Sequence, residues 1–401
     1  MKTDTSRVKR PHLRDIRTHN RSRILQILRE SELISRQELA ARLDLTPASL
    51  SRISRELIAQ GVCREVPTSR ENGQRGRPSV ALQINAKGGY LVAISISSFS
   101  RLVSIVDISG KRHFHQEIPK EVTASGETTV AFIGDYVDRL ISAQELARGK
   151  IIGAALTLPG SIDQQTGCLT KSILLNWPGF AIESRLSERL HCPVRVENNA
   201  DALCRHFLDA QPTKEHNPSS VFLAHVSEGM GASIAIGGRI VRRLADEGWI
   251  NDISVPTVGP SGEDWVKLSQ MASGRAVLTN LPDSSARLRN EGVDFSEVLG
   301  TFVTKANQSL ETESRAFFDA GHALGANLMP LTIAIAPETI VLAGPILKAD
   351  AYFAGVQKGY ADATAEMDIQ PSRIVVSHAS YIDATECLAL HDFFLSGAYG
   401  T

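Results

Sequence analysis

The sequence predicts an α/β protein in which a small head, made of three helices and a β-hairpin, precedes a larger body of two α/β lobes. Helix-like patterns followed by two strand-like patterns fill the first 85 residues, and strand-like and helix-like segments alternate through the rest. The length of 401 residues allows two or three domains at about 150 residues each. We therefore expect a head over residues 1–85, a first lobe over 86–205 and a second lobe over 206–401.

The composition is that of a folded globular protein. Apolar residues make up 42% of the chain and charged residues 22%, which excludes a disordered or fibrous protein. Uninterrupted apolar runs stay far below the roughly 20 residues that span a bilayer, so we expect a cytoplasmic protein without a membrane partner. The five cysteines show no CxxC spacing, which argues against a disulfide framework and against a structural zinc site.

The formal net charge of −1 hides a separation of charge along the chain. Residues 1–85 hold 17 Lys and Arg against 9 Asp and Glu, whereas residues 86–401 hold 26 against 35. A basic head on an acidic body suggests that an anionic partner binds the head. Fifteen of the 17 basic residues in the head are arginines, whose planar guanidinium suits phosphates and guanine edges.

Three helices are expected in the head. Apolar residues recur at helical spacing over residues 21–30, which predicts the first helix. Ser35 and Glu38 stand three positions apart, as in a capping box, and so predict the start of the second helix. Thr46, directly before a proline, predicts the N-cap of the third helix, which Gly61 should end.

The third helix carries candidate contacts to DNA. Leu50, Ile53 and Leu57 recur at i, i+3 and i+7, so they should face the core. The opposite face is then small and cationic and suits a major groove. The residues on this helix that we expect to contact DNA are Ser49, Ser51, Arg52 and Arg55.

A β-hairpin follows, with strands expected over residues 62–66 and 80–84. Its tip contains Arg75, Gly76 and Arg77, where the glycine permits close backbone approach and the arginines suit a narrow, negative minor groove. This order of elements resembles the winged helix-turn-helix of bacterial regulators, whose third helix reads the major groove and whose hairpin reaches phosphates. Double-stranded DNA is the partner that the resemblance implies, and a protein-binding winged helix is the alternative.

The body alternates strands and helices, which predicts two α/β lobes with a cleft between them. Paired strands are expected over 90–96 and 102–108, and Pro330 should end or kink a long buried helix. The other expected strands cover 151–158, 194–197, 222–226, 232–236 and 340–343, and the other helices cover 128–147, 184–190 and 311–329.

Five strings occur in the order seen in the ROK family, which groups repressors, open reading frames and sugar kinases. They are LPGSID at 158–163, NWPG at 176–179, PVRVENNA at 193–200, ASGRA at 272–276 and PETIVLAGP at 337–345. The resemblance covers nearly the whole chain, since the family's regulators carry a winged helix-turn-helix in front. It implies an actin-like ATPase fold of two α/β lobes, a homodimer or homotetramer, and a sugar bound between the lobes.

The chain departs from this family where the kinases do their chemistry. Kinase members carry an Asp-x-Gly-Gly-Thr turn after the first strand, but residues 95–99 contain neither a carboxylate nor a glycine. Asn199 stands where the family has the Asp that deprotonates the sugar hydroxyl, and an amide is not a general base. Residues 228–232, with two glycines, suit either a phosphate cradle or a tight turn.

The family's zinc site is also missing its ligand types. Residues 251–271 contain neither Cys nor His, so a loop around residues 256–264 should be held by packing and turn chemistry. We therefore predict no catalytic residue, no cofactor and no metal ion.

The resemblance places a candidate effector site between the lobes. Trp249 and Asp252 stand where the family has a Glu and a His that contact sugar hydroxyls. Trp249 suits either a platform stacked on a ligand or a core position, and Asn198 suits either a ligand hydroxyl or the capping of its own turn. The candidate effector residues are Gly160, Asn198, Asn199, Trp249 and Asp252.

The function that these observations favour is a DNA-binding transcriptional regulator, a repressor of genes for carbohydrate uptake or metabolism. A homodimer or homotetramer would place two heads on a palindromic operator, and a sugar-like effector in the cleft would change their spacing. One alternative is a regulator with a vestigial sugar site that a protein partner controls. A sugar kinase is the third hypothesis, and the missing carboxylates disfavour it.

Overall fold

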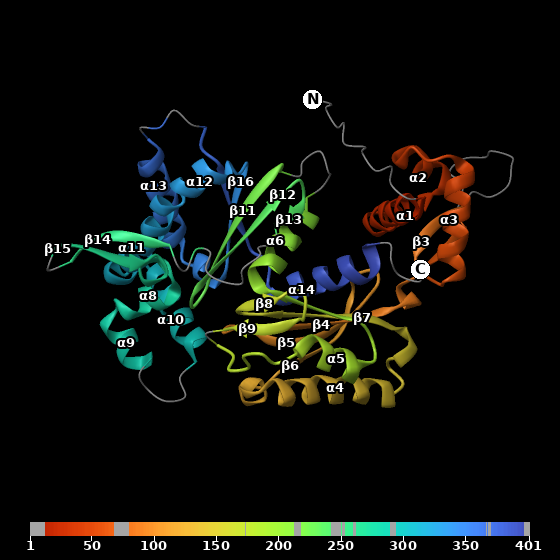
Figure 1. Cartoon of the computed structure of the whole chain (residues 1–401), viewed down its shortest axis with the longest axis horizontal. Helices are drawn as coiled ribbons and strands as arrows, with labels where there is room; N and C mark the ends of the chain where they lie inside the picture. Colours follow the sequence, from red (N-terminus) through yellow and green to blue (C-terminus); the bar gives the residue numbers. More distant parts are fainter. Residues whose placement is uncertain are drawn as a thin grey trace, which may run out of the picture.

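The computed structural model describes residues 13–67, 80–172, 174–211, 218–241, 250, 253–259, 262–288, 294–365, 367 and 370–396. The head lies at one end of the body, and the two lobes of the body stand side by side with α6 (Asn199–Asp209) and α14 (Tyr381–Leu390) between them (Figure 1). Among the described residues, no helix is both long and apolar enough to cross a membrane.

The head is the unit of three helices and a hairpin that the sequence predicts. It consists of α1 (Leu13–Glu30), β1 (Ile34–Ser35), α2 (Arg36–Leu43), α3 (Pro47–Ala59), β2 (Cys63–Pro67) and β3 (Val80–Ile84), with the strands in the order β1-β3-β2. Ser35 caps α2 by accepting a hydrogen bond from the Glu38 amide at 3.1 Å. The Thr46 hydroxyl caps α3 by accepting a hydrogen bond from the Ser49 amide at 3.2 Å. Both helices therefore begin where their caps predict.

The first lobe is a five-stranded sheet in the order β10-β7-β4-β5-β6. Strands β10, β7 and β4 run parallel, and β5 and β6 continue the sheet as antiparallel strands. The strands are β4 (Tyr90–Ile96), β5 (Arg101–Asp107), β6 (Arg112–Glu117), β7 (Ile151–Leu158) and β10 (Val194–Asn198). The short β8 (Ser161–Asp163) and β9 (Cys168–Lys171) form a separate hairpin.

The two faces of this sheet differ in chemistry. Val92, Ile94 and other apolar residues of one face form a core with α4 (Gly126–Ser142) and α5 (Ile182–Leu190). The opposite face carries the buried Ser104 and Thr157, on which α14 lies. A sheet covered by helices on both faces is the arrangement that parallel strands require.

Hydrogen bonds fix α14 on the polar face of the sheet. Thr157 and Thr385 share a hydrogen bond of 2.7 Å, and the Ser104 hydroxyl donates to Glu386 at 2.6 Å. Arg112 at the sheet's edge donates to the same carboxylate at 2.6 Å. Two hydrogen bonds to the Glu386 carboxylate, one of them from a charged guanidinium, compensate for its burial.

The second lobe is built on a five-stranded sheet in the order β13-β12-β11-β16-β17. Its strands are β11 (Ser220–Val226), β12 (Met230–Ile236), β13 (Arg239–Ile240), β16 (Thr339–Ala343) and β17 (Arg373–Ser377). Its helices are α7 (Ser269–Ala272), α8 (Gly274–Thr279), α9 (Pro282–Leu288), α10 (Phe295–Asn307), α11 (Glu311–Asn327), α12 (Met329–Ile335) and α13 (Asp350–Thr364). The predicted break before Pro330 is confirmed, since α11 ends at Asn327 and α12 starts with the proline in its first turn.

The head and the body share one hydrophobic cluster. Ile24 and Leu28 of α1 pack with Leu388 at the end of α14 and with Phe394 of the following π-helical turn, η6 (His391–Leu395). The connection from the head to the body, η1 (Ala86–Gly88), packs tightly against the head, since a Cβ on Gly88 would lie 2.5 Å from the Gly61 carbonyl oxygen. The head is therefore seated on the body by segments from both ends of the chain.

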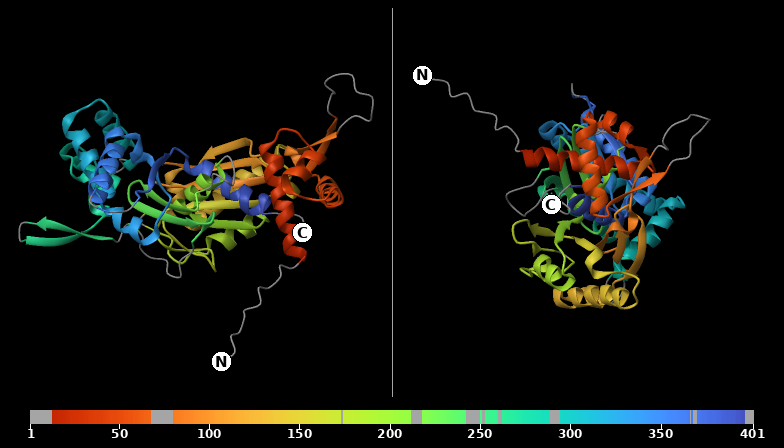
Figure 2. Two further views of the ribbon diagram at one scale, coloured as in Figure 1. Left: turned by 90° about the horizontal axis from the view of Figure 1, so that it is seen from above. Right: turned by 90° about the vertical axis from the view of Figure 1, so that its right-hand side faces the viewer.

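One expectation is corrected by the structure. The stretch around residues 256–264, which we expected to be a loop, belongs to an antiparallel hairpin of β14 (Ser254–Gly259) and β15 (Gly262–Lys267). Val255 and Thr257 stand two positions apart on β14, as the period of a strand requires, and Val255 pairs with Val266 of β15. Figure 2 shows this hairpin projecting from the second lobe, with Trp265 66% exposed.

Helices α11 and α13 pack backbone against backbone through glycines. A Cβ on Gly321 would lie 2.1 Å from the Tyr352 carbonyl oxygen, and one on Gly325 would lie 2.1 Å from the Val356 oxygen. A Cβ added to Gly355 or Gly359 of α13 would likewise lie 2.1 or 2.2 Å from a carbonyl oxygen of α11. Any side chain at these positions must push the helices apart.

We expect Gly325→Ala to lower the free energy of unfolding by about 2 kcal/mol, because overpacking outweighs the higher helix propensity of alanine. Gly300→Ala in α10 is the matched control, since no atom lies within 4 Å of its added Cβ. The control should stabilise the protein by up to about 1 kcal/mol. Urea unfolding of the two variants measures both effects, and equal stability of the two would contradict the close packing.

Candidate DNA-binding face and interlobe cleft

Helix α3 presents one buried face and one exposed face. Leu50, Ile53 and Leu57 are at most 2% exposed and join the core of the head, as the helical spacing predicts. Arg52 and Arg55 are exposed on the other face, and Ser49 and Ser51 are half-buried there. The Arg55 Nε donates to the Ser51 carbonyl at 3.2 Å, which holds that side chain along the helix. The Ser49 hydroxyl accepts from Thr46 at 3.0 Å.

The arginines of the head fall into paired and unpaired sets. Arg17, Arg36 and Arg42 form ion pairs with Glu56, Glu65 and Glu38 at 2.6–2.8 Å. Within the described part of the chain, no ion pair involves Arg52 or Arg55. The positive charge of α3 is therefore available to an anionic partner.

The predicted contacts at the hairpin tip, Arg75, Gly76 and Arg77, lie outside the described residues. The strands that lead to this tip are paired in register from Cys63↔Ile84 to Pro67↔Val80.

Between the lobes, the loop after β4 contacts the second lobe through its own side chains. Ser97 closes this loop by accepting hydrogen bonds from the Phe99 and Ser100 amides at 3.1 and 2.9 Å. The Ser98 hydroxyl of the first lobe donates to Glu228 of the second at 2.7 Å. Phe99 packs edge-to-face on Phe295 of the second lobe, with 6.0 Å between ring centroids.

Glu228 occupies the turn between β11 and β12. From the sequence, residues 228–232 suit either a phosphate cradle or a tight turn. The Ser227 amide donates to the Gly229 carbonyl at 2.8 Å, so the segment is a tight turn between antiparallel strands. Arg275 forms an ion pair with Glu228 and lies 5.7 Å from the centroid of the Phe295 ring. The Glu228 carboxylate bonds to Ser98 of the first lobe and to Arg275 of the second, so it joins the lobes directly. Its negative charge disfavours a phosphate at this turn.

The candidate effector residues that the structure describes meet at one edge of the first sheet. Asn198 ends β10 opposite Leu158 of β7, and Gly160 follows two residues later. The carboxyl ends of parallel strands are where α/β proteins bind ligands. Gly160 has a φ of +143°, and a Cβ there would lie 2.2 Å from the Lys171 carbonyl, so only glycine fits.

The two asparagines at this edge have different surroundings. Asn198 caps α6, because its side-chain oxygen accepts from the Asp201 amide at 2.8 Å and its amide donates to the Asp201 carboxylate at 3.0 Å. Asn199 is 4% exposed and donates to the Ile96 carbonyl at 3.2 Å. Its side-chain oxygen has no hydrogen-bond partner among the described residues. A buried acceptor without a partner suits a ligand hydroxyl or water.

Two further candidates, Trp249 and Asp252, lie outside the described residues. Glu197 is 1% exposed and accepts a hydrogen bond from Gln164 at 3.2 Å, so its carboxylate is used in holding the fold. Within the described residues, no group of three or more His, Cys, Asp or Glu side chains is arranged to hold a metal ion.

Sequence reasoning did not find the contacts that join the lobes. Ser98, Phe99 and Arg275 were not singled out as partners, because hydrogen bonds between residues far apart in the chain leave no periodic signal. The pairing of His225 with Tyr381 is a second example, with 2.7 Å between Nε2 and the tyrosine oxygen. Burial lowers the pKa of His225 to about 4, so the imidazole is neutral at pH 7.

Comparison with known proteins assigns the body to a family. A model of the ROK family matches residues 103–385 of this chain. The chain belongs to the ROK family. A model of the MarR family matches residues 18–68, within the head. The resemblance and the winged helix-turn-helix predicted from the sequence are thus confirmed.

Named relatives of this ROK protein are regulators. The DNA-binding transcriptional dual regulator NagC of Escherichia coli K12 is 22% identical over 341 residues, covering 82% of this chain and 81% of that protein. The xylose repressor of Bacillus spizizenii is 24% identical over 247 residues, covering 60% of this chain and 62% of that protein.

Solved structures with the same fold include regulators and kinases. A ROK family transcriptional regulator described as a homolog of the Escherichia coli MLC protein superposes with a TM-score of 0.73 at 21% identity, covering 95% of this chain and 98% of that one. The ROK hexokinase of Thermus thermophilus superposes with a TM-score of 0.56 at 21% identity, covering 75% of this chain and 97% of that one. These similarities confirm the actin-like two-lobed fold. The named relatives and the MarR-family match over the head indicate a transcriptional regulator rather than an enzyme.

The buried His225 gives the stability of this ROK protein a pH dependence. Its pKa is lowered on folding, so below pH 6.5 the unfolded chain binds a proton that the folded protein excludes until about pH 4. Stability should fall as pH drops through this window, by about 1.4 kcal/mol per pH unit from this residue alone.

Urea unfolding of the wild type and of His225→Gln at pH 7, 6, 5 and 4 measures this contribution. The wild type should lose more stability than the variant over this range, since glutamine does not titrate. Parallel pH profiles of the two proteins would show that His225 is protonated equally in the folded and unfolded states.

Proposed function

We propose that this ROK protein is a cytoplasmic repressor of genes for carbohydrate uptake or metabolism, released from its operator by a sugar-like effector in the interlobe cleft. The single observation that carries the DNA-binding part is the exposed face of α3, where Arg52 and Arg55 have no carboxylate partner among the described residues. The carbohydrate part is supported by relatives named N-acetylglucosamine repressor and xylose repressor.

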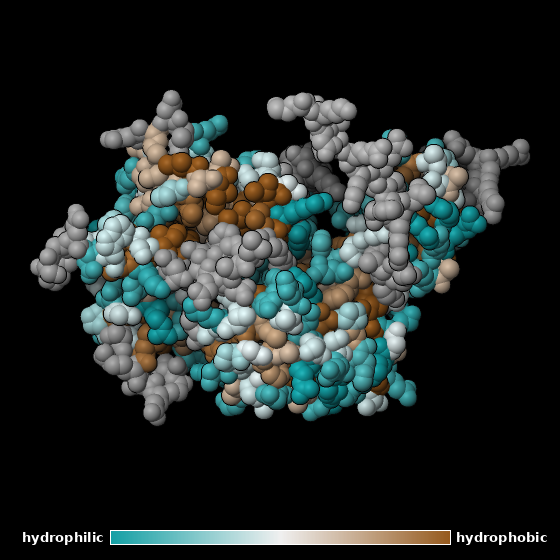
Figure 3. Space-filling model, in the orientation of Figure 1, coloured by the Kyte–Doolittle hydropathy of each residue, from teal (hydrophilic) through white to brown (hydrophobic). Residues whose placement is uncertain are grey.

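The proposed assembly is a homodimer or homotetramer that places two heads on a palindromic operator. Ile236 and Ile333 are 56% and 55% exposed, in the region of β12 and α12 where Figure 3 shows apolar side chains gathered on the second lobe. Exposed apolar areas of this kind favour association between subunits.

Helix α14 supplies a route from the cleft to the head. Tyr381 at its start bonds to His225 of the second lobe, and Glu386 at its middle bonds to Ser104 of the first lobe. Leu388 and Phe394, at its end and in the turn that follows, pack in the core of the head. A ligand that prefers one lobe arrangement by about 100-fold would supply roughly 2.7 kcal/mol to shift this helix.

The second candidate function is control by a protein partner, and one observation favours it. Trp265 on the projecting β14–β15 hairpin is 66% exposed, and exposed aromatic residues are frequent anchors of protein interfaces. Binding of small sugars to the cleft separates the two candidates, because a vestigial site binds none.

We expect Arg52→Ala to weaken operator binding by about 5- to 150-fold if the guanidinium reads a base. If it contacts a phosphate instead, the slope of log affinity against log salt should fall by about one. The operator comes from selection of fragmented genomic DNA with the purified protein, and fluorescence anisotropy measures affinity.

Arg42→Ala is the matched control for this variant. Arg42 is exposed in the same head but pairs with Glu38 on α2, so its loss should leave DNA affinity within about twofold. Equal weakening by the two substitutions would reject α3 as the reading helix.

We expect Asn199→Ala to weaken sugar binding by at least about tenfold, because the side-chain oxygen without a partner is then missing. Calorimetry with N-acetylglucosamine, xylose and glucose measures it, and circular dichroism checks the fold. Asn280→Ala, at an exposed position in the second lobe, should bind as the wild type does. Absence of saturable binding in the wild type would favour the protein partner.

A further inference from the structure

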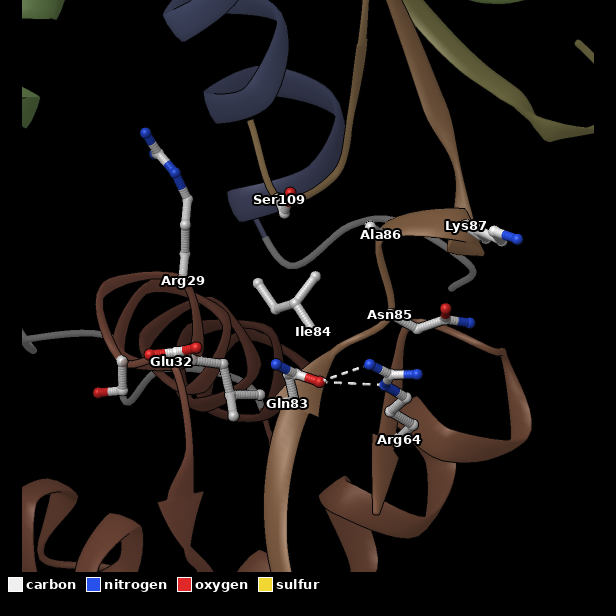
Figure 4. A pocket seen from close by; sticks show the side chains of 11 residues that line it. Arg29, Glu32, Arg64, Gln83, Ile84, Asn85, Ala86, Lys87 and Ser109 are labelled. Atoms are coloured by element: carbon white, nitrogen blue, oxygen red, sulfur yellow. Dashed lines mark hydrogen bonds between the residues drawn. The ribbon is translucent and has the colours of Figure 1, made fainter. Parts of the chain in front are cut away.

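A cavity of about 460 Å³ lies at the joint between the head and the body, away from the interlobe cleft. The end of α1, the bases of β2 and β3, the segment 85–87 and the turn after β5 surround it (Figure 4). Its volume falls in the range of small-molecule sites. The cavity is lined by Leu28, Arg29, Ser31, Glu32, Arg64, Gln83, Ile84, Asn85, Ala86, Lys87 and Ser109.

The lining has the chemistry of an anion site. Arg29, Arg64 and Lys87 give the lining three positive charges against the one carboxylate of Glu32, and the ammonium of Lys87 is directed away from Ile84 (Figure 4). The buried Ile84 forms an apolar floor in the centre of the view, with Arg29 and Glu32 on the side of α1 (Figure 4). An apolar floor with a few polar groups around it is typical of a site for a small organic ligand.

Among the described residues, the cations of this cavity take part in no ion pair. Arg64 donates to the side-chain oxygen of Gln83 at 3.0 Å from Nε and 2.8 Å from Nη2, and an amide carries no charge. No ion pair in the described part of the chain involves Arg29, Arg64 or Lys87. Other arginines of the head, such as Arg36 and Arg42, are paired with glutamates. The excess charge at the joint therefore favours an incoming anion.

We propose that this cavity, which we name the joint site, binds a small organic anion whose phosphate or carboxylate is attracted by the positive charges of Arg29 and Arg64, on opposite sides of Ile84 (Figure 4). Arg64 offers its guanidinium from the base of the hairpin, oriented by Gln83. Planar guanidinium groups bind both kinds of oxyanion through paired hydrogen bonds. The joint site is separate from the candidate effector residues at the ends of β7 and β10.

A ligand in the joint site would touch both parts of the molecule. Leu28, Arg29 and Arg64 belong to the head, whereas Ser109 belongs to a turn of the body. The same turn meets α1 directly, since a Cβ on Gly110 would lie 3.8 Å from the Arg29 Nε. An anion bridging these walls selects one orientation of the head on the body, and its binding is then coupled to DNA binding.

Calorimetry on the full chain at low salt tests the proposal with three probes: glucose 6-phosphate, citrate and uncharged glucose. We expect saturable binding of at least one anion, weakened at least about tenfold in Arg29→Gln and in Arg64→Gln, since each removes a charge-assisted contact. Lys111→Gln is the matched control, because this exposed cation stands two residues from Ser109 but does not line the cavity. It should bind the anion within about twofold of the wild type.

Three calorimetric results and one DNA-binding result would overturn the joint site. They are no saturable binding of either anion, equal weakening in Lys111→Gln, and loss of binding in Asn199→Ala, which would place the anion in the interlobe cleft. A fourth is weaker operator binding by Arg64→Gln without any added anion, which would assign this cation to DNA phosphate. The proposed repressor function can hold in each of these cases, so the two failures are distinguishable.

Discussion

The buried carboxylate of Glu386 determines where α14 crosses the first lobe. This group is 8% exposed, and it accepts hydrogen bonds from Ser104 beneath it and from Arg112 at the sheet edge. A charge at this depth is tolerated only with such partners, so α14 can neither slide nor rotate without leaving it unpaired. The same helix begins at Tyr381, which bonds to His225 of the second lobe, and ends in the core of the head, so this contact bears on the positions of all three parts.

The charge separation along the chain acquires a physical meaning in the folded protein. Several arginines of the head are neutralised by its own glutamates, so the excess charge that remains is concentrated rather than spread evenly. It appears on the outer face of α3 and at the joint with the body. Between the lobes, by contrast, the charge of Glu228 is balanced, because Arg275 pairs with this carboxylate and Ser98 donates a hydrogen bond to it.

Much of the fold could be predicted because its elements are locally encoded. The period of apolar residues and the Thr46 cap located α3, and a continuous apolar run located β7 with its observed ends. Helix α14 escaped prediction, since nine of its ten residues are buried and no polar face produces a helical period. The domain boundaries and the site residues stay predictions. Asn198 illustrates why, because a cap and a ligand contact require the same side chain in the same sequence position.

The shared core of head and body also bears on how the protein is made. Residues 388–395 fill a space between head and body, yet they are synthesised long after the head itself. At ordinary translation rates the head waits roughly 15 to 60 s on the ribosome before this segment emerges. During that interval α1 exposes apolar residues that the finished protein covers, and the recognition helix is presented in an orientation the body does not yet control. Nascent chains are therefore the form of this protein most in need of chaperone protection.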